Sequence, residues 1–201
     1  MNLRGRRGYS SPLRAEQAEA TRERIVDATV ELLQGRDPGA FGMQDVADRA
    51  GVSLRTVYRV FPKKDDLLGG VLTAIKERFE QIAGTPPRTR EEFDASVAGA
   101  VRAVFELEPL YRALFSTIAG RETHQRGAGE RRGTLEVAFA DDLAGLSSEQ
   151  VRLIASVLHL VTSSQSVLWL KDYAGVDVDE ASAAIGWAVT ALANAAREAE
   201  R

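Results

Sequence analysis

Apolar residues recur at helical spacing along nearly the whole chain, and no stretch alternates between apolar and polar positions for long enough to predict a strand. The first apolar stripe begins at Ser11 and Pro12, which favour an N-cap and a first helical position, and it ends before Gly35. Further stripes predict helices over about residues 43–50, 54–61 and 64–82. The pattern therefore predicts an all-α fold.

The second part of the chain follows a Gly-Thr-Pro-Pro boundary at residues 84–87. A Gly/Arg-rich segment at 120–133 interrupts the helical pattern, and Ser147 with Gln150 forms a predicted capping box for a later helix. The helices expected here cover about residues 89–107, 109–119, a stretch ending near 143, 148–173 and 178–199.

The composition is that of a soluble globular protein: of 201 residues, 44% are apolar and 27% are charged. The chain has no cysteine, which excludes disulfides, thiolate metal sites and a cysteine nucleophile. Its basic N-terminus lacks the apolar run of a signal peptide. The most apolar stretch, residues 151–170, contains Arg152, His159 and a polar run at 162–166, which predicts a poor membrane span. We therefore expect a cytoplasmic protein with no membrane partner.

Charge is distributed unevenly along the chain. Residues 1–64 carry 12 Lys or Arg and 8 Asp or Glu, whereas residues 65–201 carry 14 and 21. A basic first third on an acidic body suits a DNA-binding head joined to a body that DNA would repel. A chance difference between solvated helices is the alternative interpretation.

Residues 42–68, GMQDVADRAGVSLRTVYRVFPKKDDLL, have the outline of a helix-turn-helix. Gly51 permits the sharp turn between the two helices, and Ser53 is expected to cap the second. Val57 and Phe61 stand four residues apart and are expected to be buried together. Because this motif presents its second helix to the major groove, the segment predicts double-stranded DNA as a partner.

The outer face of that second helix carries the chemistry for DNA contact. Arg55 stands in its first turn, where arginine can donate two hydrogen bonds to a guanine; a solvated arginine is the alternative. Lys63 and Lys64 begin the next helix, where a bound phosphate would offset their unfavourable interaction with the helix dipole. Solvated lysines balanced by acidic neighbours are the alternative there. The other candidates on or beside this face are Ser53, Leu54, Thr56, Tyr58 and Arg59.

Three arginines, Arg4, Arg6 and Arg7, precede the first helix in a Gly-containing stretch. Arms of this kind can follow the minor groove, where narrow A·T segments concentrate negative potential. The stretch is therefore predicted to be either a further DNA contact or a solvated tail.

The segment resembles the tetracycline-repressor (TetR) family of transcriptional regulators. The likeness covers TRERIVDATVELLQ, MQDVADRAGVS and RTVYRVFPKKDDLL, between residues 21 and 68. It implies an all-helical homodimer with a variable C-terminal ligand domain, and DNA contacts by Gln44, Arg55, Thr56, Tyr58 and Lys64.

The chain departs from the family pattern at several positions. Gly42 replaces the usual Ser or Thr cap, which puts one phosphate contact in doubt, and Lys63 replaces the usual Ser or Asn cap. Leu54 and Arg55 are also unusual, so we expect an operator preference particular to this protein. The pair Gly69-Gly70 inside a helix indicates close packing against the first helix or a flexible point.

The body is predicted to hold a dimer interface. The helix expected over 148–173 is apolar on most faces and the last helix is rich in small residues, so two copies could form a four-helix interface; an internal core is the alternative. The interface residues we expect are Ile154, Leu158, Val161, Leu168, Ile185, Ala188 and Leu192.

The signal for a ligand pocket is weaker. Polar or aromatic side chains that interrupt the apolar helices of the body are the candidates, since ligand pockets are apolar with a few polar groups. They are Phe105, Tyr111, Phe115, His159, Thr162, Gln165 and Trp169. Each is also compatible with a place in the core or the interface. A small apolar or amphipathic effector is the predicted ligand.

The sequence thus predicts a basic arm (1–11), a helix-turn-helix domain (12–64) and a ligand-binding and dimerisation domain (65–201). The expected function is that of a repressor that binds a palindromic operator as a homodimer and is released by a small effector. The alternatives are control by a protein partner, constitutive repression, or a carrier or enzyme with a vestigial head. No catalytic constellation, cofactor motif or metal cluster is evident, so enzyme activity is not expected.

Overall fold

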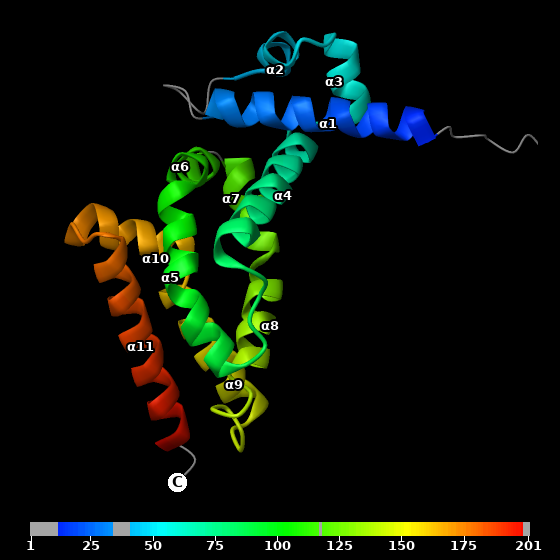
Figure 1. The fold of residues 1–201 in the computed structure, drawn as a ribbon. Helices are drawn as coiled ribbons and strands as arrows, with labels where there is room; N and C mark the ends of the chain where they lie inside the picture. The colour runs from blue at the N-terminus through cyan, green and yellow to red at the C-terminus, as the bar shows by residue number, and fades with distance from the viewer. Residues whose placement is uncertain (1–11, 34–40, 117, 199–201) are drawn as a thin grey trace, which may run out of the picture.

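The computed structural model describes residues 12–33, 41–116 and 118–198, and this part of the chain is helical with turns between the helices (Figure 1). The elements are α1 (Pro12–Leu33), α2 (Met43–Ala50), α3 (Leu54–Val60), α4 (Lys64–Ala83), α5 (Arg90–Glu106), α6 (Glu108–Ser116), α7 (Ile118–Arg126), α8 (Ala128–Ala138), α9 (Ser148–Val161), α10 (Ser164–Trp169), the π-helical turn η1 (Leu170–Ala174) and α11 (Val178–Glu198). The predicted all-α fold is confirmed. The predicted ends at Ser11 and Gly35 lie outside the described residues.

Helices α1, α2 and α3 form a head that sits across the first turns of α4 (Figure 1). Its core is apolar and closed: Ile25 of α1, Val46 of α2 and Val57 of α3 are each 0% exposed. Phe61, which follows α3, is 1% exposed beside them, so the expected joint burial of Val57 and Phe61 is confirmed.

The turn between α2 and α3 forms as its sequence predicts. Gly51 has a φ of 65°, in the left-handed region that glycine adopts without steric cost. The Ser53 hydroxyl accepts a hydrogen bond from the Thr56 backbone N–H at 3.1 Å and so caps α3. The Lys63 backbone N–H donates to Asp66 at 3.0 Å, which fixes the start of α4 at Lys64.

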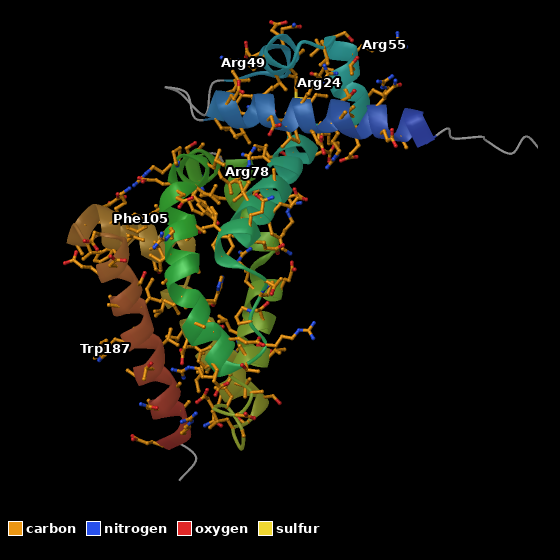
Figure 2. All side chains as sticks on the ribbon, in the orientation of Figure 1. Arg24, Arg49, Arg55, Arg78, Phe105 and Trp187 are labelled. Carbon is orange, nitrogen blue, oxygen red and sulfur yellow. The ribbon has the colours of Figure 1, made fainter. Side chains whose placement is uncertain are left out.

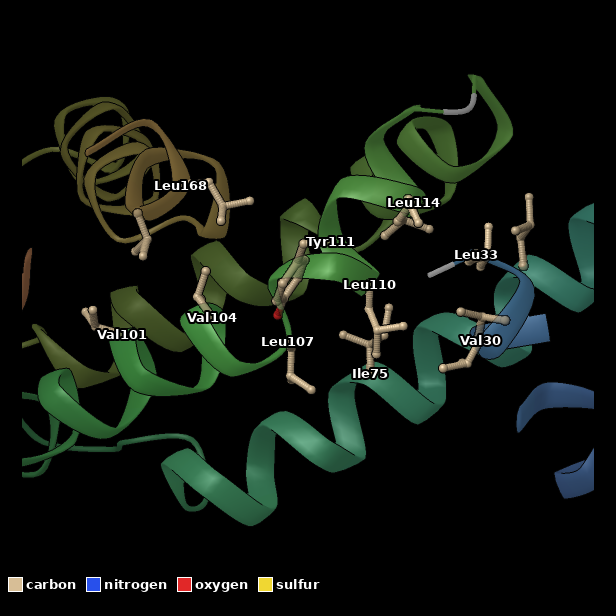
Figure 3. Close-up of a cluster of buried hydrophobic side chains, with 14 of the residues drawn as sticks. Val30, Leu33, Ile75, Val101, Val104, Leu107, Leu110, Tyr111, Leu114 and Leu168 are labelled. Carbon is tan, nitrogen blue, oxygen red and sulfur yellow. The ribbon is translucent and has the colours of Figure 1, made fainter. Parts of the chain in front are cut away.

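The head joins the body through one apolar seam. Val30 and Leu33 at the end of α1 meet Ile75 of α4 and Leu110 and Leu114 of α6, and all five side chains are buried (Figure 3). Because α4 continues through this seam without a break, it contributes to the head core at one end and to the body at the other.

Helices α5, α8, α9, α10 and α11 make up the rest of the body together with α6 and α7 (Figure 1). The expectation that residues 120–133 interrupt the helical pattern is wrong: α7 and most of α8 are built from them. Glycine disfavours a helix by about 1 kcal/mol per residue, but the burial of Leu135 and Ala138 supplies the tertiary packing that propensity ignores.

The helix expected over residues 148–173 is broken. It begins at Ser148 with the predicted Ser147–Gln150 capping box, but it stops at Thr162, and Ser163 caps a new helix by accepting a hydrogen bond from the Ser166 backbone N–H. Hydroxyl groups of Thr162 and Ser163 donate to the carbonyls of Leu158 and Leu160 and so satisfy the end of α9.

By length and composition, Ser148–Ala174 is apolar enough to cross a membrane, contrary to our expectation from the sequence. A core helix of a globular protein has the same character, so this property is weak evidence for a membrane span.

The glycine pair in α4 has two different environments. A Cβ at Gly70 would lie 3.0 Å from the Phe61 ring and 3.3 Å from Val26 of α1, whereas a Cβ at Gly69 would meet nothing within 4 Å. Close packing against α1 thus accounts for Gly70 alone.

We predict that the two Gly→Ala substitutions change the free energy of unfolding in opposite directions. Gly69→Ala should raise the free energy of unfolding by up to about 1 kcal/mol, because alanine favours a helix. Gly70→Ala should instead lower the free energy of unfolding by about 1–3 kcal/mol, because the added methyl group presses on buried Phe61. Urea unfolding measures both; equal stabilisation by the two variants would contradict the packing argument.

Candidate functional site

The outer face of α3 presents a compact set of basic and hydroxyl side chains. Arg55 and Arg59 are exposed, one helical turn apart, and Tyr58 between them is 48% exposed. Figure 2 shows Arg55 on the side of the head that faces away from the body. These side chains can donate to base edges or phosphates without any rearrangement of the core.

The other predicted DNA-contact residues at the start of α3 already make contacts within the head. The hydroxyls of Ser53 and Thr56 lie 2.8 Å apart, and Leu54 is half-buried against the head core. The Ser53 hydroxyl is already the N-cap of α3. The two hydroxyls keep free lone pairs or protons for DNA, whereas Leu54 offers a limited apolar contact.

On α2, Gln44 is exposed and its Nε2 donates to Asp48 at 2.7 Å. Gly42, which lacks a capping side chain, is compensated by Asp45, whose carboxylate accepts from the Gly42 backbone N–H at 2.6 Å. The helix therefore has its N-terminal cap even though the side chain expected from the family pattern is missing.

Lys64 has an internal partner that the sequence did not suggest. Its Nζ donates to the Phe41 carbonyl at 2.7 Å and lies 4.0 Å from the centre of the Phe41 ring. It is half-buried, whereas Lys63 beside it is exposed. Lys64 thus ties the start of α4 to the segment before α2, and Lys63 is the more accessible of the two for a phosphate.

The arm residues Arg4, Arg6 and Arg7 lie outside the described residues.

A cavity of about 450 Å³ lies in the body. Residues of α4, α5 and α8 form most of its lining, and α6, α7, α9, α10 and α11 complete it. Its lining is mostly apolar, with side chains such as Leu72 of α4, Val101 and Val104 of α5 and Val167 of α10. Of the predicted ligand residues, Tyr111, His159 and Thr162 line it. Figure 3 shows the hydroxyl of Tyr111 directed toward the end of α5 that carries Val104.

The other four predicted ligand residues are placed elsewhere. Phe105 packs beneath Lys171, whose Nζ is 5.0 Å from the ring centre, and Phe115 stacks on Tyr111 outside the cavity. Gln165 is exposed, and Trp169 is 56% exposed and stacks on a neighbouring tyrosine. The aromatic character of a helix does not reveal whether its ring faces a cavity or solvent.

Burial holds the two histidines and the tyrosine that line the cavity in their neutral forms. Burial lowers the pKa of His124 to about 4, and burial also lowers the pKa of His159; in both, the nearby Arg131 adds to the effect. Burial raises the pKa of Tyr111 to about 12. Arg131 itself stays cationic, although burial lowers its pKa as well.

Sequence reasoning missed His124 and Arg131, because both lie in the Gly/Arg-rich segment. A helical reading would have found Arg131, since Ala128, Arg131, Leu135 and Ala138 follow the three- and four-residue spacing of one helix face. It also missed the wall that α4 contributes to the cavity.

The predicted interface residues fall into two groups. Leu158, Leu168 and Ile185 are at most 6% exposed within one protomer, so they belong to its core and the expectation for these three is corrected. Ile154, Val161, Ala188 and Leu192 are half-buried.

The apolar side chains that face outward on α9 are different ones. Leu153, Val157 and Leu160 form a stripe along α9 at helical spacing, 50%, 44% and 64% exposed. Helix α11 packs against α9 and carries Trp187, which is 76% exposed. Figure 2 shows Trp187 on the outer side of α11. An exposed apolar stripe of this kind is a candidate interaction surface.

Comparisons with known proteins agree with this architecture. The family model described as "Bacterial regulatory proteins, tetR family" matches residues 25–71. The HTH-type transcriptional repressor KstR of Mycolicibacterium smegmatis is 30% identical over 172 residues, which cover 80% of this chain and 81% of KstR. KstR of Mycobacterium tuberculosis is 36% identical over 107 residues, covering 52% of this chain and 44% of that protein.

Among solved structures, native NalD, the secondary repressor of the MexAB-OprM multidrug efflux pump in Pseudomonas aeruginosa, superposes with a TM-score of 0.64 at 20% identity. The match covers 87% of this chain and 96% of NalD, and it shows a common fold. With the family match in the head and the KstR likeness over most of the length, the chain belongs to the TetR family of DNA-binding transcriptional regulators.

Proposed function

We propose that this protein is a repressor that binds a palindromic operator as a homodimer and leaves it when a small molecule enters the body. The observation that carries the proposal is that α4 both closes the core of the DNA-binding head and forms a wall of the cavity. Its relatives named as repressors support the direction of control.

For DNA binding, we propose that Arg55, Tyr58 and Arg59 read or hold the major groove. All three are exposed on the second helix of the helix-turn-helix. Gln44, Ser53, Thr56 and Lys63 supply further polar contacts at its edges. We propose residues 12–64 as the DNA-binding unit and 65–201 as the effector and dimer unit, with α4 shared between them, in a protein that acts in the cytoplasm.

For the response, the position of α4 decides the spacing of the two heads. Leu72, Ile75 and Phe79 of α4 line the cavity, one to two turns beyond Leu68 and Val71, which are buried in the core cluster. A ligand that fits better when α4 is displaced would favour a head spacing that no longer matches the operator. The ligand must bind that state more tightly, because equal affinity for both states shifts nothing.

For assembly, the outward stripe of α9 and Trp187 of α11 are proposed to face a second copy. In a twofold dimer the same surface of both copies forms the interface, so each contact occurs twice and the surface is self-complementary. Two recognition helices held about 34–36 Å apart would then meet successive major grooves.

Two other functions are less consistent with the structure. A constitutive repressor, or one controlled by a protein partner alone, would not need a cavity in its body. This body has a cavity of about 450 Å³. A vestigial head on an enzyme or carrier would not need the exposed arginines of α3.

We predict that Arg55→Ala relaxes base preference at one position of each half-site. Losing a bidentate arginine–guanine contact costs about 1–3 kcal/mol of discrimination. The measurement is a gel shift of the DNA upstream of the gene, with single-base variants of the protected site. Arg102→Ala on α5, exposed and in the body, is the control of equal charge change. No shift of wild-type protein at low salt would refute DNA binding itself; unchanged discrimination by the Arg55 variant would refute the role of Arg55.

We predict that Leu160→Asp converts the dimer into a monomer. A carboxylate placed on each copy of the apolar surface should weaken self-association by at least about thirtyfold, the scale of a 2 kcal/mol hot spot. Ile118→Asp is the matched control, because Ile118 is 69% exposed on α7, which packs against α4 and α6 instead.

Sedimentation measures the dimer directly, and tryptophan emission gives a second readout. The two tryptophans, Trp169 and Trp187, are both exposed in the protomer, so dilution of a dimer that covers Trp187 should shift its emission to the red. If Leu160→Asp leaves the sedimentation unchanged, the interface lies elsewhere.

We predict that Ala100→Trp closes the cavity without disturbing the head. Ala100 lines the cavity from α5, whereas Ala95 on the same helix is exposed and serves as the control for the same substitution. The neutral dye N-phenyl-1-naphthylamine should bind wild-type and Ala95→Trp protein at one site per subunit. The Ala100 variant should lose at least about tenfold in dye affinity because the ring occupies apolar volume. Equal binding by both variants would place the dye outside the cavity.

A further inference from the structure

Arg131 carries a positive charge in the cavity wall, and no carboxylate of the described residues forms a salt bridge with it. Its Nη2 donates to the His124 carbonyl at 2.7 Å. Its Nε is buried without a hydrogen-bond partner, and within the described part of the chain its Nη1 makes no hydrogen bond. A desolvated cation without a counterion is unfavourable, so an anion in the cavity would be stabilised there.

The adjacent carboxylates are committed to another cation. Glu130 accepts from Lys76 Nζ at 2.9 Å, and Glu80 acts on the same lysine from its own helix. All three side chains line the cavity, Lys76 and Glu80 from α4 and Glu130 from α8. Glu130 also attracts Arg131 through space, but its carboxylate accepts its hydrogen bond from Lys76. The Arg131 Nε therefore keeps no hydrogen-bond partner.

The other polar groups near Arg131 are neutral at physiological pH. His124 and His159 line the cavity with pKa values lowered by burial, and the Tyr111 hydroxyl keeps its proton. Each can donate or accept a hydrogen bond without adding charge. Together they form a polar end to a cavity that is otherwise apolar.

We infer that the effector is an amphipathic anion, with a carboxylate held by Arg131 and an apolar body among the side chains of α4, α5 and α10. The inference rests on the proposed function, in which this cavity is the effector site. Guanidinium and carboxylate pair through charge-assisted hydrogen bonds, and the lining beyond Arg131 includes Leu72, Val101, Val104 and Val167.

Gly127 leaves the space that the guanidinium occupies. A Cβ at Gly127 would lie 2.7 Å from Arg131 Nη1, which is the far end of a flexible side chain. The glycine has a φ of −81°, so alanine is compatible with the backbone. Gly127→Ala should therefore displace the Arg131 guanidinium while the fold and the charge are retained. The variant tests the position of the guanidinium separately from its charge.

The test uses the full chain and three probes of equal length: dodecanoate, 1-dodecanol and dodecylamine. Calorimetry should show that wild-type protein binds dodecanoate about ten- to a hundredfold more tightly than dodecanol, the range expected for a hydrogen bond to a charged group. Dodecylamine should be the weakest. Arg131→Gln should remove most of the preference for the anion, and Gly127→Ala should reduce it.

Arg132→Gln is the matched control, because Arg132 is the next residue, pairs with Glu136 at 3.8 Å and does not line the cavity. It should keep the preference of the wild type. The inference is overturned if dodecanol binds as tightly as dodecanoate, if Arg131→Gln keeps the preference, or if dodecanoate does not bind.

These failures are distinguishable from a failure of the proposed function. If dodecanol or dodecylamine displaces the neutral dye and releases DNA, the cavity is an effector site of another chemical class. If neither the dye nor any probe enters the cavity, the ligand response itself is refuted.

Discussion

The structure depends on one constraint: a single uninterrupted helix, α4, must bury apolar side chains in two places at once. Leu67, Leu68 and Val71 belong to the core beneath the head, and Ile75 lies in the seam with α1 and α6. Phe79, one turn further, lines the cavity. Because close-packed interiors transmit strain, a displacement of α4 at the cavity would bear on the core beneath the head. The exposed α1–α4 ion pair of Arg78 with Asp27 at 2.9 Å adds little to this coupling, since exposed pairs contribute about 0–1 kcal/mol.

The body holds a buried carboxylate and a half-buried guanidinium that are treated in opposite ways. Asp142, 2% exposed, is paired with Arg90 and Arg197, and the pair with Arg90 is 3.7 Å long. Those contacts tie the segment after α8 to α5 and α11, so this charge has a structural role. Arg131 has no such partner in the described part of the chain. The contrast between a compensated and an uncompensated charge is what separates a structural ion pair from a candidate binding group.

How much could be predicted from the sequence depended on how local the determining interaction is. The turn at Gly51, the Ser53 cap and the joint burial of Val57 and Phe61 follow from residues a few positions apart, and all are confirmed. Residues 120–133 were misjudged because their helices depend on packing against distant elements, which glycine propensity does not contain. The core and interface faces of α9 could not be separated, because both are apolar and periodicity alone does not say which one a partner covers. The cavity is lined by side chains from α4 through α11, so these helices had to be placed in space before its lining could be known.

Helix α9 divides its two faces between different tasks. His159 and Thr162 look into the cavity, whereas Val157 and Leu160 face outward. The side chains proposed for DNA contact, for ligand contact and for self-association therefore form sets with no residue in common. Substitutions can accumulate in one set while the other two stay under their own selection. A gene duplicate of such a protein could acquire a new chemical signal while it keeps its old operator and its own partner, which makes this arrangement a favourable starting point for divergence.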